Sequence, residues 1–430
     1  MARSAKNAHT TPGAARETPI VAVSRAWLIA LTALLIVPWL VAGGIYIWGS
    51  GEKAAPFPAP SEMDTPAEPG AAGPWGRLTV TPIIISPPIE YVAADWKRSE
   101  VSDEWHFPGV TTEMLEAFLL SSGMSRDEIA SVKSSARSDP RTHGLIVTPH
   151  LELVRKMNPE VRAHLYLQLG KSSLNFDQAD AFRFFGASSD AWLTGSLISQ
   201  RTRQLVEPLI YRDGDYLLFA DAELIRSQVR DIEELRRLAK TLLRQATMLV
   251  RLSVKEGSDV ERLAEYWGRG GRRTDLRPLL ESIVCANQDQ SIDIVHLLPT
   301  FARNHLYRYP KITTADLDRP MLSNCLWTAL NFFRDQPEDR FLDGNVALSS
   351  LKQDYYIVES GFQLGDIVAF LDAGGNLFHV AVYLAADLVF SKNGTSPVSP
   401  WAITTIDRLK GFYRQRAANP RLIYHRRKDF

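Results

Sequence analysis

The sequence predicts an α+β protein with an N-terminal transmembrane helix, a mainly helical middle region and a C-terminal domain in which a helix precedes an antiparallel sheet. Three observations lead to this. Residues 26–48 carry no charge, apolar residues recur at three- and four-residue steps through much of 95–310, and short β-rich runs follow residue 310. Periods near 3.6 and 2 distinguish helices from strands, and a helix followed by successive strands indicates α+β. The length of 430 residues allows two or three domains.

The composition excludes several classes of protein. Lys plus Arg and Asp plus Glu balance at 49 each, so no overall charge attracts nucleic acid, and no nucleic-acid partner is expected. A hydrophobic content of 45% indicates that most of the chain folds. The two cysteines, Cys285 and Cys325, are too few for a disulfide framework.

The polar motifs of metal and cofactor sites are absent from the sequence. It contains no HExxH or CxxC, and His296 and His305 are not at metal-ligand spacing, so neither a metal nor a cofactor is expected. The glycine- and arginine-rich stretch 268–273 is compatible with an anion-binding nest or with a solvated basic turn.

Residues 1–25 form a short N-terminal segment before the uncharged run. At about 1.5 Å of rise per residue, residues 26–48 are long enough to cross a bilayer as a helix. Four basic residues precede the run: Arg3, Lys6, Arg16 and Arg25. Only Lys53 follows closely, which places the N-terminus in the cytoplasm and the bulk of the chain outside. A cleaved signal peptide is the alternative, but its apolar core is usually shorter and no A-x-A site follows. We therefore expect a single-pass protein of the cytoplasmic membrane.

The next segment, 49–76, is predicted to be a spacer. It holds six prolines with many Ala and Gly residues, a composition that buries too little apolar surface to order itself. Residues 79–85 are β-branched but interrupted by Pro82, which is typical of an edge strand.

Residues 77–310 are predicted to form a mainly helical domain, or two. Ser125 and Glu128 match a capping box, and Asn158 precedes a proline at a helix start. The apolar spacing through 222–254 predicts one long helix whose apolar face packs in a core. Tyr266 and Trp267, at the end of a helical stretch, are expected to fill the same core.

Residues 311–430 are predicted to form a helix and a sheet. The helix covers about 324–334, and the strands cover 366–371, 378–384, 387–391, 402–406 and 421–425. The glycine-rich stretch 372–376 indicates a hairpin turn between the first two strands.

Cys325 is the first candidate catalytic residue. It opens the predicted helix after Asn324, where unpaired N–H groups and the helix dipole favour an anion and lower the pKa of a thiol. The alternative is a buried structural cysteine, because free cysteine is among the most buried residue types.

His379 and Asn393 complete a set of nucleophile, base and orienting residue. His379 lies on a predicted strand with Ala381 on the same face, while Val380 faces the other way. Asn393 follows the next strand and is positioned to accept a hydrogen bond from the imidazole. Ser391 shares its parity and is an alternative third residue.

This order of motifs resembles the NlpC-type and CHAP-type amidases of the papain-like superfamily over about residues 320–415. The motifs are a cysteine opening a helix, Gly365-Asp366-Ile367-Val368, then His379-Val380-Ala381-Val382, then a polar residue after the next strand. The resemblance implies that Cys325 is the nucleophile, His379 its base and Asn393 the third residue. The chain departs from the NlpC pattern at Asn324, where Asp is usual, and at 326–327, where Leu-Trp replaces a small Ser-Gly pair.

Two functions of different classes follow. The first is a membrane-anchored, extracytoplasmic cysteine hydrolase that acts on an amide or ester. The resemblance suggests a cell-wall peptide as the substrate. The second is a non-catalytic envelope scaffold that binds a partner and retains a papain-like fold, since a fold does not dictate its function.

Overall fold

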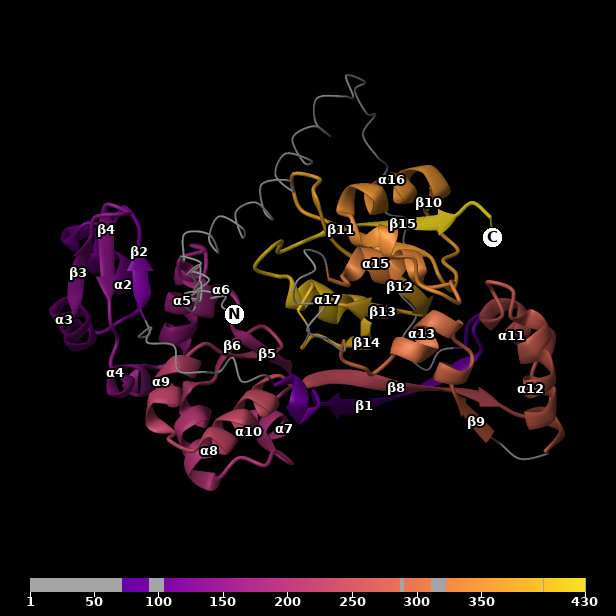
Figure 1. Cartoon of the computed structure of the whole chain (residues 1–430), viewed down its shortest axis with the longest axis horizontal. Helices are drawn as coiled ribbons and strands as arrows, with labels where there is room; N and C mark the ends of the chain where they lie inside the picture. Colours follow the sequence, from indigo (N-terminus) through magenta and orange to yellow (C-terminus); the bar gives the residue numbers. More distant parts are fainter. Residues whose placement is uncertain (1–71, 93–103, 287–289, 311–321, 397, 430) are drawn as a thin grey trace, which may run out of the picture. The chain divides into compact units, whose positions relative to one another are not determined.

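The computed structural model describes residues 72–92, 104–286, 290–310, 322–396 and 398–429 (Figure 1). Within them the protein is α+β, as predicted, with three three-stranded antiparallel sheets and one six-stranded antiparallel sheet. The predicted N-terminal segment 1–25, the transmembrane helix 26–48 and the spacer up to residue 71 lie outside the described residues. Among the helices of the described ranges, none has the length and hydropathy of a membrane span.

The first sheet has the order β1-β8-β9, with β1 at Arg77–Ile85, β8 at Gln245–Val254 and β9 at Gln290–Asp293. β1 pairs with β8 along its whole length, from Arg77 opposite Ser253 to Ile85 opposite Gln245. In the described part of the chain β8 is its one neighbour, so the predicted edge strand is confirmed. Pro82 is tolerated there because an edge strand has a free side that needs no donor.

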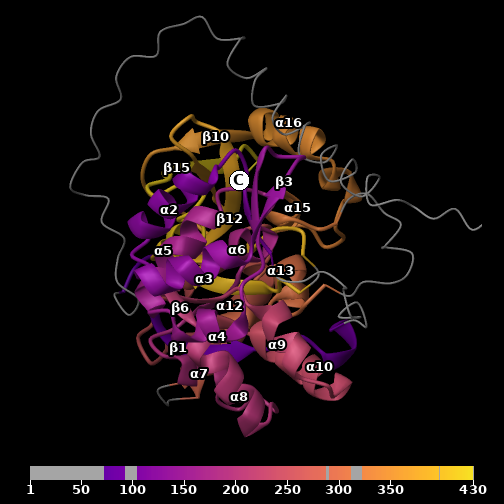
Figure 2. The ribbon, with the colours of Figure 1, turned by 90° about the vertical axis from the view of Figure 1, so that its left-hand side faces the viewer.

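Two further sheets and a set of short helices make up the module between residues 104 and 244, called the middle module below (Figure 2). Its strands are β2 (Trp105–Phe107), β3 (Ala136–Asp139), β4 (Gly144–Val147), β5 (Phe182–Phe185), β6 (Tyr211–Asp213) and β7 (Tyr216–Phe219). Its helices are α2 (Thr112–Ser121), α3 (Arg126–Ser134), α4 (Leu151–Lys156), α5 (Pro159–Leu169), α6 (Phe176–Ala179), α7 (Ser189–Leu193), α8 (Gln200–Val206), α9 (Ala222–Gln228) and α10 (Ile232–Leu242). The expected mainly helical region therefore also contains sheets.

The helix starts predicted in this module are confirmed. The Ser125 hydroxyl accepts the Glu128 N–H, and the Glu128 carboxylate accepts the Ser125 N–H at 2.7 Å. The Asn158 side chain accepts the Glu160 N–H at 2.8 Å, with proline at the first helical position. These contacts satisfy N–H groups that a helix leaves unpaired.

The single long helix predicted over 222–254 is wrong. The backbone at Val229 is extended and ends α9, and Asp231 then caps α10 by accepting the Glu233 N–H at 3.0 Å. Residues 245–254 form β8, which pairs with a strand on each side. Two-sided pairing by distant segments outweighs a local helical pattern there.

The segment after β8 carries α11 (Val260–Trp267), α12 (Arg273–Cys285) and α13 (Thr300–His305). Tyr266 and Trp267 are buried, as expected. The Tyr266 hydroxyl donates to the Leu384 carbonyl at 2.7 Å, and the Trp267 indole donates to the Trp75 carbonyl at 2.9 Å. These two side chains join the segment to the C-terminal sheet and to the residues before β1.

The C-terminal domain has a sheet of order β10-β15-β11-β12-β13-β14. The strands are β10 (Tyr355–Val358), β11 (Ile367–Leu371), β12 (Leu377–Ala385), β13 (Leu388–Lys392), β14 (Trp401–Thr405) and β15 (Arg421–Arg427). The helices are α15 (Cys325–Asn331), α16 (Gly344–Asp354) and α17 (Ile406–Phe412), with a short 3-10 turn at Asp339–Leu342. Elsewhere in the described ranges, 3-10 turns occur at Ile89–Tyr91, Glu207–Leu209 and Ile294–His296. The predicted strands are confirmed. β10, α16 and α17 were not predicted.

The two faces of this sheet pack against different helices. Val380, Val382 and Leu384 of β12 share an apolar core with Leu326 and Leu330 of α15. On the other face, Ala381 and Tyr383 pack with Ile406 and Leu409 of α17. Because strand side chains alternate, the residues from Val380 to Leu384 face the two helices in turn.

Candidate active site

Cys325 is the first residue of α15, as predicted. The Asn324 side chain caps the helix by accepting the Trp327 N–H at 2.9 Å. The residue as a whole is half-buried. Burial raises the pKa of the Cys325 thiol, although the N–H groups of Val380 and Leu326 and the charge of Lys392 oppose this. The expected lowering of this pKa is therefore wrong for the structure, because the loss of hydration outweighs the helix start.

Lys392 is a charged residue near Cys325 that the sequence analysis missed. Its side chain is fully buried, and its ammonium donates to the carbonyls of Gly394 at 3.0 Å and Ser396 at 3.1 Å. It also lies 5.7 Å from the ring centre of Trp401. Burial lowers the pKa of Lys392 to about 7, and the charge of Cys325 opposes this shift. The sequence did carry a signal for this residue: Lys392 stands in β13 on the same face as the apolar Leu388 and Phe390.

The Trp401 indole links this lysine to the helix that carries the thiol. Trp401 lies opposite Lys392 in the β13–β14 register. Its indole N–H donates to the Thr328 hydroxyl at 3.0 Å, one turn after Cys325 in α15. Lys392, Trp401 and the start of α15 therefore form one packed group.

His379 lies on β12 opposite Phe370 and is buried at 1% exposure. Its Nε2 is 3.0 Å from the Ser391 hydroxyl, and its Nδ1 is 3.1 Å from the Tyr413 hydroxyl. Burial lowers the pKa of His379 to about 3, so the ring is neutral at physiological pH.

The hydrogen-bond chain through Ser391 fixes the tautomer of this ring. The Ser391 hydroxyl donates its one proton to the Asn393 carbonyl oxygen at 3.2 Å, so its oxygen accepts from Nε2–H of His379. The lone pair of His379 therefore lies on Nδ1, where it accepts the Tyr413 proton. Both alternatives for the third residue take part in this chain: Ser391 contacts the ring, and Asn393 orients Ser391.

The helix that begins at Cys325 and the side chain of His379 lie on opposite faces of the sheet. His379 shares the α17 face with Phe370, which belongs to the core there, whereas α15 packs on the other face. Across the described residues no hydrogen bond joins the thiol to the ring. The N–H of Val380, the residue next to His379, does interact with the thiol and lowers its pKa. The thiol therefore lies beside the strand that carries the imidazole.

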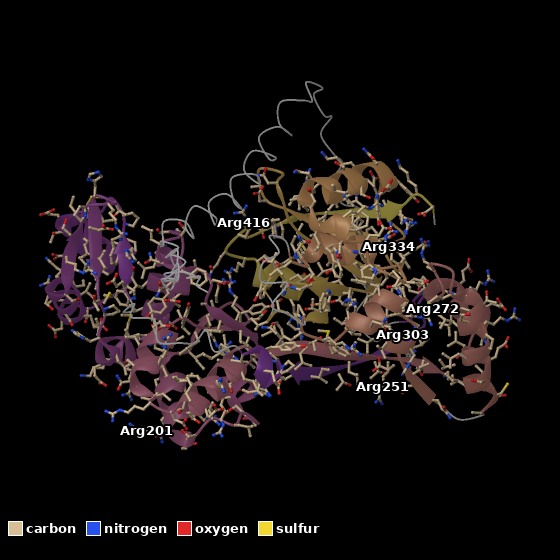
Figure 3. All side chains as sticks on the ribbon, viewed as in Figure 1. Arg201, Arg251, Arg272, Arg303, Arg334 and Arg416 are labelled. Atoms are coloured by element: carbon tan, nitrogen blue, oxygen red, sulfur yellow. The ribbon has the colours of Figure 1, made fainter. Side chains whose placement is uncertain are left out.

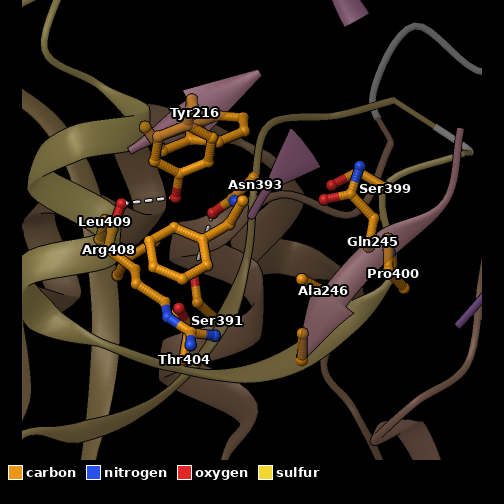
Figure 4. Close-up of a pocket in the computed structure, with 13 residues that line it drawn as sticks. Tyr216, Gln245, Ala246, Ser391, Asn393, Ser399, Pro400, Thr404, Arg408 and Leu409 are labelled. Carbon is orange, nitrogen blue, oxygen red and sulfur yellow. Dashed lines mark hydrogen bonds between the residues drawn. The ribbon is translucent and has the colours of Figure 1, made fainter. Parts of the chain in front are cut away.

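A small cavity lies beside Ser391 and Asn393 (Figure 4). Its volume is about 40 Å³, room for a few water molecules. Arg408 and Leu409 of α17 line it from the C-terminal domain, and Tyr216 lines it from the middle module. The cavity therefore lies where the hydrogen-bond chain approaches the middle module.

The other polar candidates have structural partners. Arg272, labelled in Figure 3, donates from Nη1 to the Leu297 carbonyl at 2.9 Å. It thus packs into a neighbouring turn, which neither the nest nor the solvated turn predicted. His305 Nδ1 lies 2.7 Å from the Phe301 carbonyl. Within the described ranges no group of three or more His, Cys, Asp or Glu side chains is arranged to hold a metal.

Comparison with known proteins finds no matching family model, no matching curated protein and no matching solved structure.

Proposed function

We propose that the protein is a membrane-anchored cysteine hydrolase that cleaves an amide or ester bond outside the cytoplasm. One observation carries the proposal. The chain from Asn393 through Ser391 to His379 leaves a lone pair on Nδ1, in the residue next to the one whose N–H meets the Cys325 thiol. A nucleophile, a base and a group that orients the base are the parts that thiol catalysis needs.

The reaction uses these groups in two steps. Cys325 transfers its proton to Nδ1 of His379, and the thiolate attacks the substrate carbonyl carbon to form a C–S bond. The C–N or C–O bond of the substrate then breaks, and the leaving group takes the proton from the imidazolium. Water next adds to the thioester with His379 as base, the C–S bond breaks, and the released acid leaves Cys325 protonated again.

Lys392 and the start of α15 support the charged states of this reaction. The Lys392 charge and the N–H groups of Leu326 and Val380 favour the Cys325 thiolate. The same backbone N–H groups are suited to hold the negative oxygen of the tetrahedral intermediate. In the resting protein the effect of burial on the thiol pKa is larger than the effect of Lys392 and the N–H groups. The thiolate therefore forms only when His379 is within reach to take the proton.

The location and substrate class rest on the sequence. The uncharged run 26–48 with basic residues before it supports an anchor with its N-terminus inside. The resemblance to NlpC-type and CHAP-type amidases supports a peptide of the cell wall as the substrate.

Substitution of the nucleophile tests this function in the full chain. Cys325→Ala removes a small side chain at a helix start, so we expect folding to survive at a cost of about 1 kcal/mol. We expect hydrolysis of cell-wall peptides and of an activated aryl ester to be lost, as it is in His379→Gln. Cys285→Ser is the matched control because Cys285 is exposed, and it should keep full activity. A folded Cys325→Ala protein with unchanged turnover refutes the hydrolase.

The non-catalytic scaffold is the second candidate. Both ring nitrogens of His379 are engaged by hydroxyl groups, and burial raises the pKa of the Cys325 thiol. A scaffold predicts that Cys325→Ala restores the phenotype of a deletion strain. It also predicts that disruption of the apolar face of α10 abolishes partner binding and the phenotype.

A further inference from the structure

The Tyr413 hydroxyl occupies the position on His379 from which a base must act. It lies 3.1 Å from Nδ1, and the two ring centres are 4.6 Å apart. Burial raises the pKa of Tyr413 well above its usual value, so the hydroxyl stays a neutral donor. Because Ser391 fixes the proton on Nε2, the Tyr413 hydroxyl covers the one lone pair of the ring that is free to take a proton.

The middle module holds the helix that ends beside Tyr413. Arg183 of β5 donates to the Phe412 carbonyl at 2.7 Å and to the Gln415 side chain at 3.2 Å. These two acceptors flank Tyr413 in the sequence. The main chain around Tyr413 is therefore tied to the middle module by one side chain on both sides.

A second tie holds the middle of α17. The Tyr216 hydroxyl donates to the Arg408 carbonyl at 2.7 Å, a bond drawn in Figure 4. The Arg408 guanidinium lies 3.8 Å from the ring centre of Phe185. The cavity of about 40 Å³ between these side chains and Ser391 leaves this contact less than fully packed.

We propose that the Tyr413 hydroxyl blocks Nδ1 of His379, and that the middle module holds it there through Arg183 and Tyr216. This blocking contact is called the latch below. While α17 is held, Nδ1 accepts the Tyr413 proton and cannot accept the Cys325 proton. When the middle module shifts, for instance on engaging the cell-wall substrate, Tyr413 leaves and the imidazole becomes free to serve the thiol. The latch rests on the proposed cysteine hydrolase, because it regulates the same base.

Alkylation of Cys325 tests the latch in the full-length protein. The background is Cys285→Ser, so that one thiol remains, and iodoacetamide labelling at neutral pH is followed by mass spectrometry. Tyr413→Phe keeps the ring and removes the hydroxyl. We expect labelling of Cys325 to rise by about fivefold, the factor that one neutral hydrogen bond supplies. Arg183→Met should raise it as well.

Two controls show whether the effect passes through His379. Tyr383→Phe makes the same change in the same apolar cluster and should leave labelling unchanged. Tyr413→Phe combined with His379→Gln should lose the gain, because the freed lone pair is then absent. An unchanged rate in Tyr413→Phe overturns the latch, and so does a gain that survives His379→Gln or appears equally in Tyr383→Phe.

A second readout separates the latch from the hydrolase. An activated aryl ester should acylate Cys325 if the thiol attacks carbonyl carbon. Acylation without any response to Tyr413→Phe overturns the latch and keeps the hydrolase. A labelling response without acylation overturns the hydrolase and leaves Tyr413 as a control on the accessible base.

Discussion

From the burial of Lys392 we predict how the free energy of unfolding changes with pH. Its pKa falls from 10.5 to about 7 because the ammonium is desolvated. At about 1.4 kcal/mol per unit, keeping this charge buried costs roughly 5 kcal/mol at pH 7 and below. The folded state binds fewer protons than the unfolded state between pH 7 and 10.5, so the free energy of unfolding should rise with pH across that window and be lowest below it.

Lys392→Met removes the charge together with two hydrogen bonds to backbone carbonyls. Those bonds contribute about 2 kcal/mol in total. We therefore expect the variant to be more stable than the wild type by roughly 1–3 kcal/mol at pH 6. It should be less stable near pH 10.5, where the wild-type amine is neutral and keeps its bonds.

Urea unfolding of the full chain in detergent, followed by tryptophan fluorescence, measures the stability of both proteins at pH 6, 8 and 10. Lys410→Met is the matched control, because Lys410 is exposed and pairs with Asp407. It should shift stability little and keep the wild-type slope with pH. If Lys392→Met keeps the same slope between pH 7 and 10, Lys392 is not the buried group that titrates, and the account of its environment is refuted.

Three other predictions follow from buried polar groups. His379 has a pKa of about 3 when folded against 6.5 ordinarily, so stability should fall as pH drops from 6.5 to 3, by up to about 5 kcal/mol. His379→Gln should flatten this acid limb in urea unfolding at pH 4 and 7, and an unchanged limb contradicts the assignment. Ser391→Ala should lower kcat more than Asn393→Ala with KM little changed, because Ser391 contacts the ring directly; the reverse order contradicts the chain. Burial raises the pKa of Asp221 from 3.8 to about 6, so this carboxyl lowers the stability as pH rises from about 3.8 to 6. Asp221→Asn should therefore raise the free energy of unfolding by up to about 3 kcal/mol at pH 7. A thermal scan at pH 4 and pH 7 that shows equal effects contradicts that sign.

Local patterns were sufficient for the strands β11 to β15 of the C-terminal domain, but not for β10, α16 or α17. These five strands are short β-rich runs of five to nine residues, so each is visible in its own sequence. Cys325 at a helix start was predictable for the same reason, because Asn324 is an N-cap residue by type.

Long-range pairing was not predictable. Residues 245–254 carry helical spacing, but Val250 lies opposite Val80 in the register of β1, and no local pattern reports a partner so far away. Tyr413 was missed because its contact with His379 depends on α17 folding back over the sheet. The lowered pKa expected for Cys325 failed because burial depends on the side chains packed around the helix start, not on the helix alone.

The central claim is that Cys325 attacks carbonyl carbon with His379 as its base. The most direct measurement is peptide mapping of the full-length protein after brief reaction with p-nitrophenyl acetate, in the wild type, in Tyr413→Phe and in each of these with His379→Gln. The account predicts an acetyl group on Cys325 in the first two proteins and its near loss when His379 is replaced. Acetylation confined to Cys285, or a Cys325 adduct that is indifferent to His379, contradicts it.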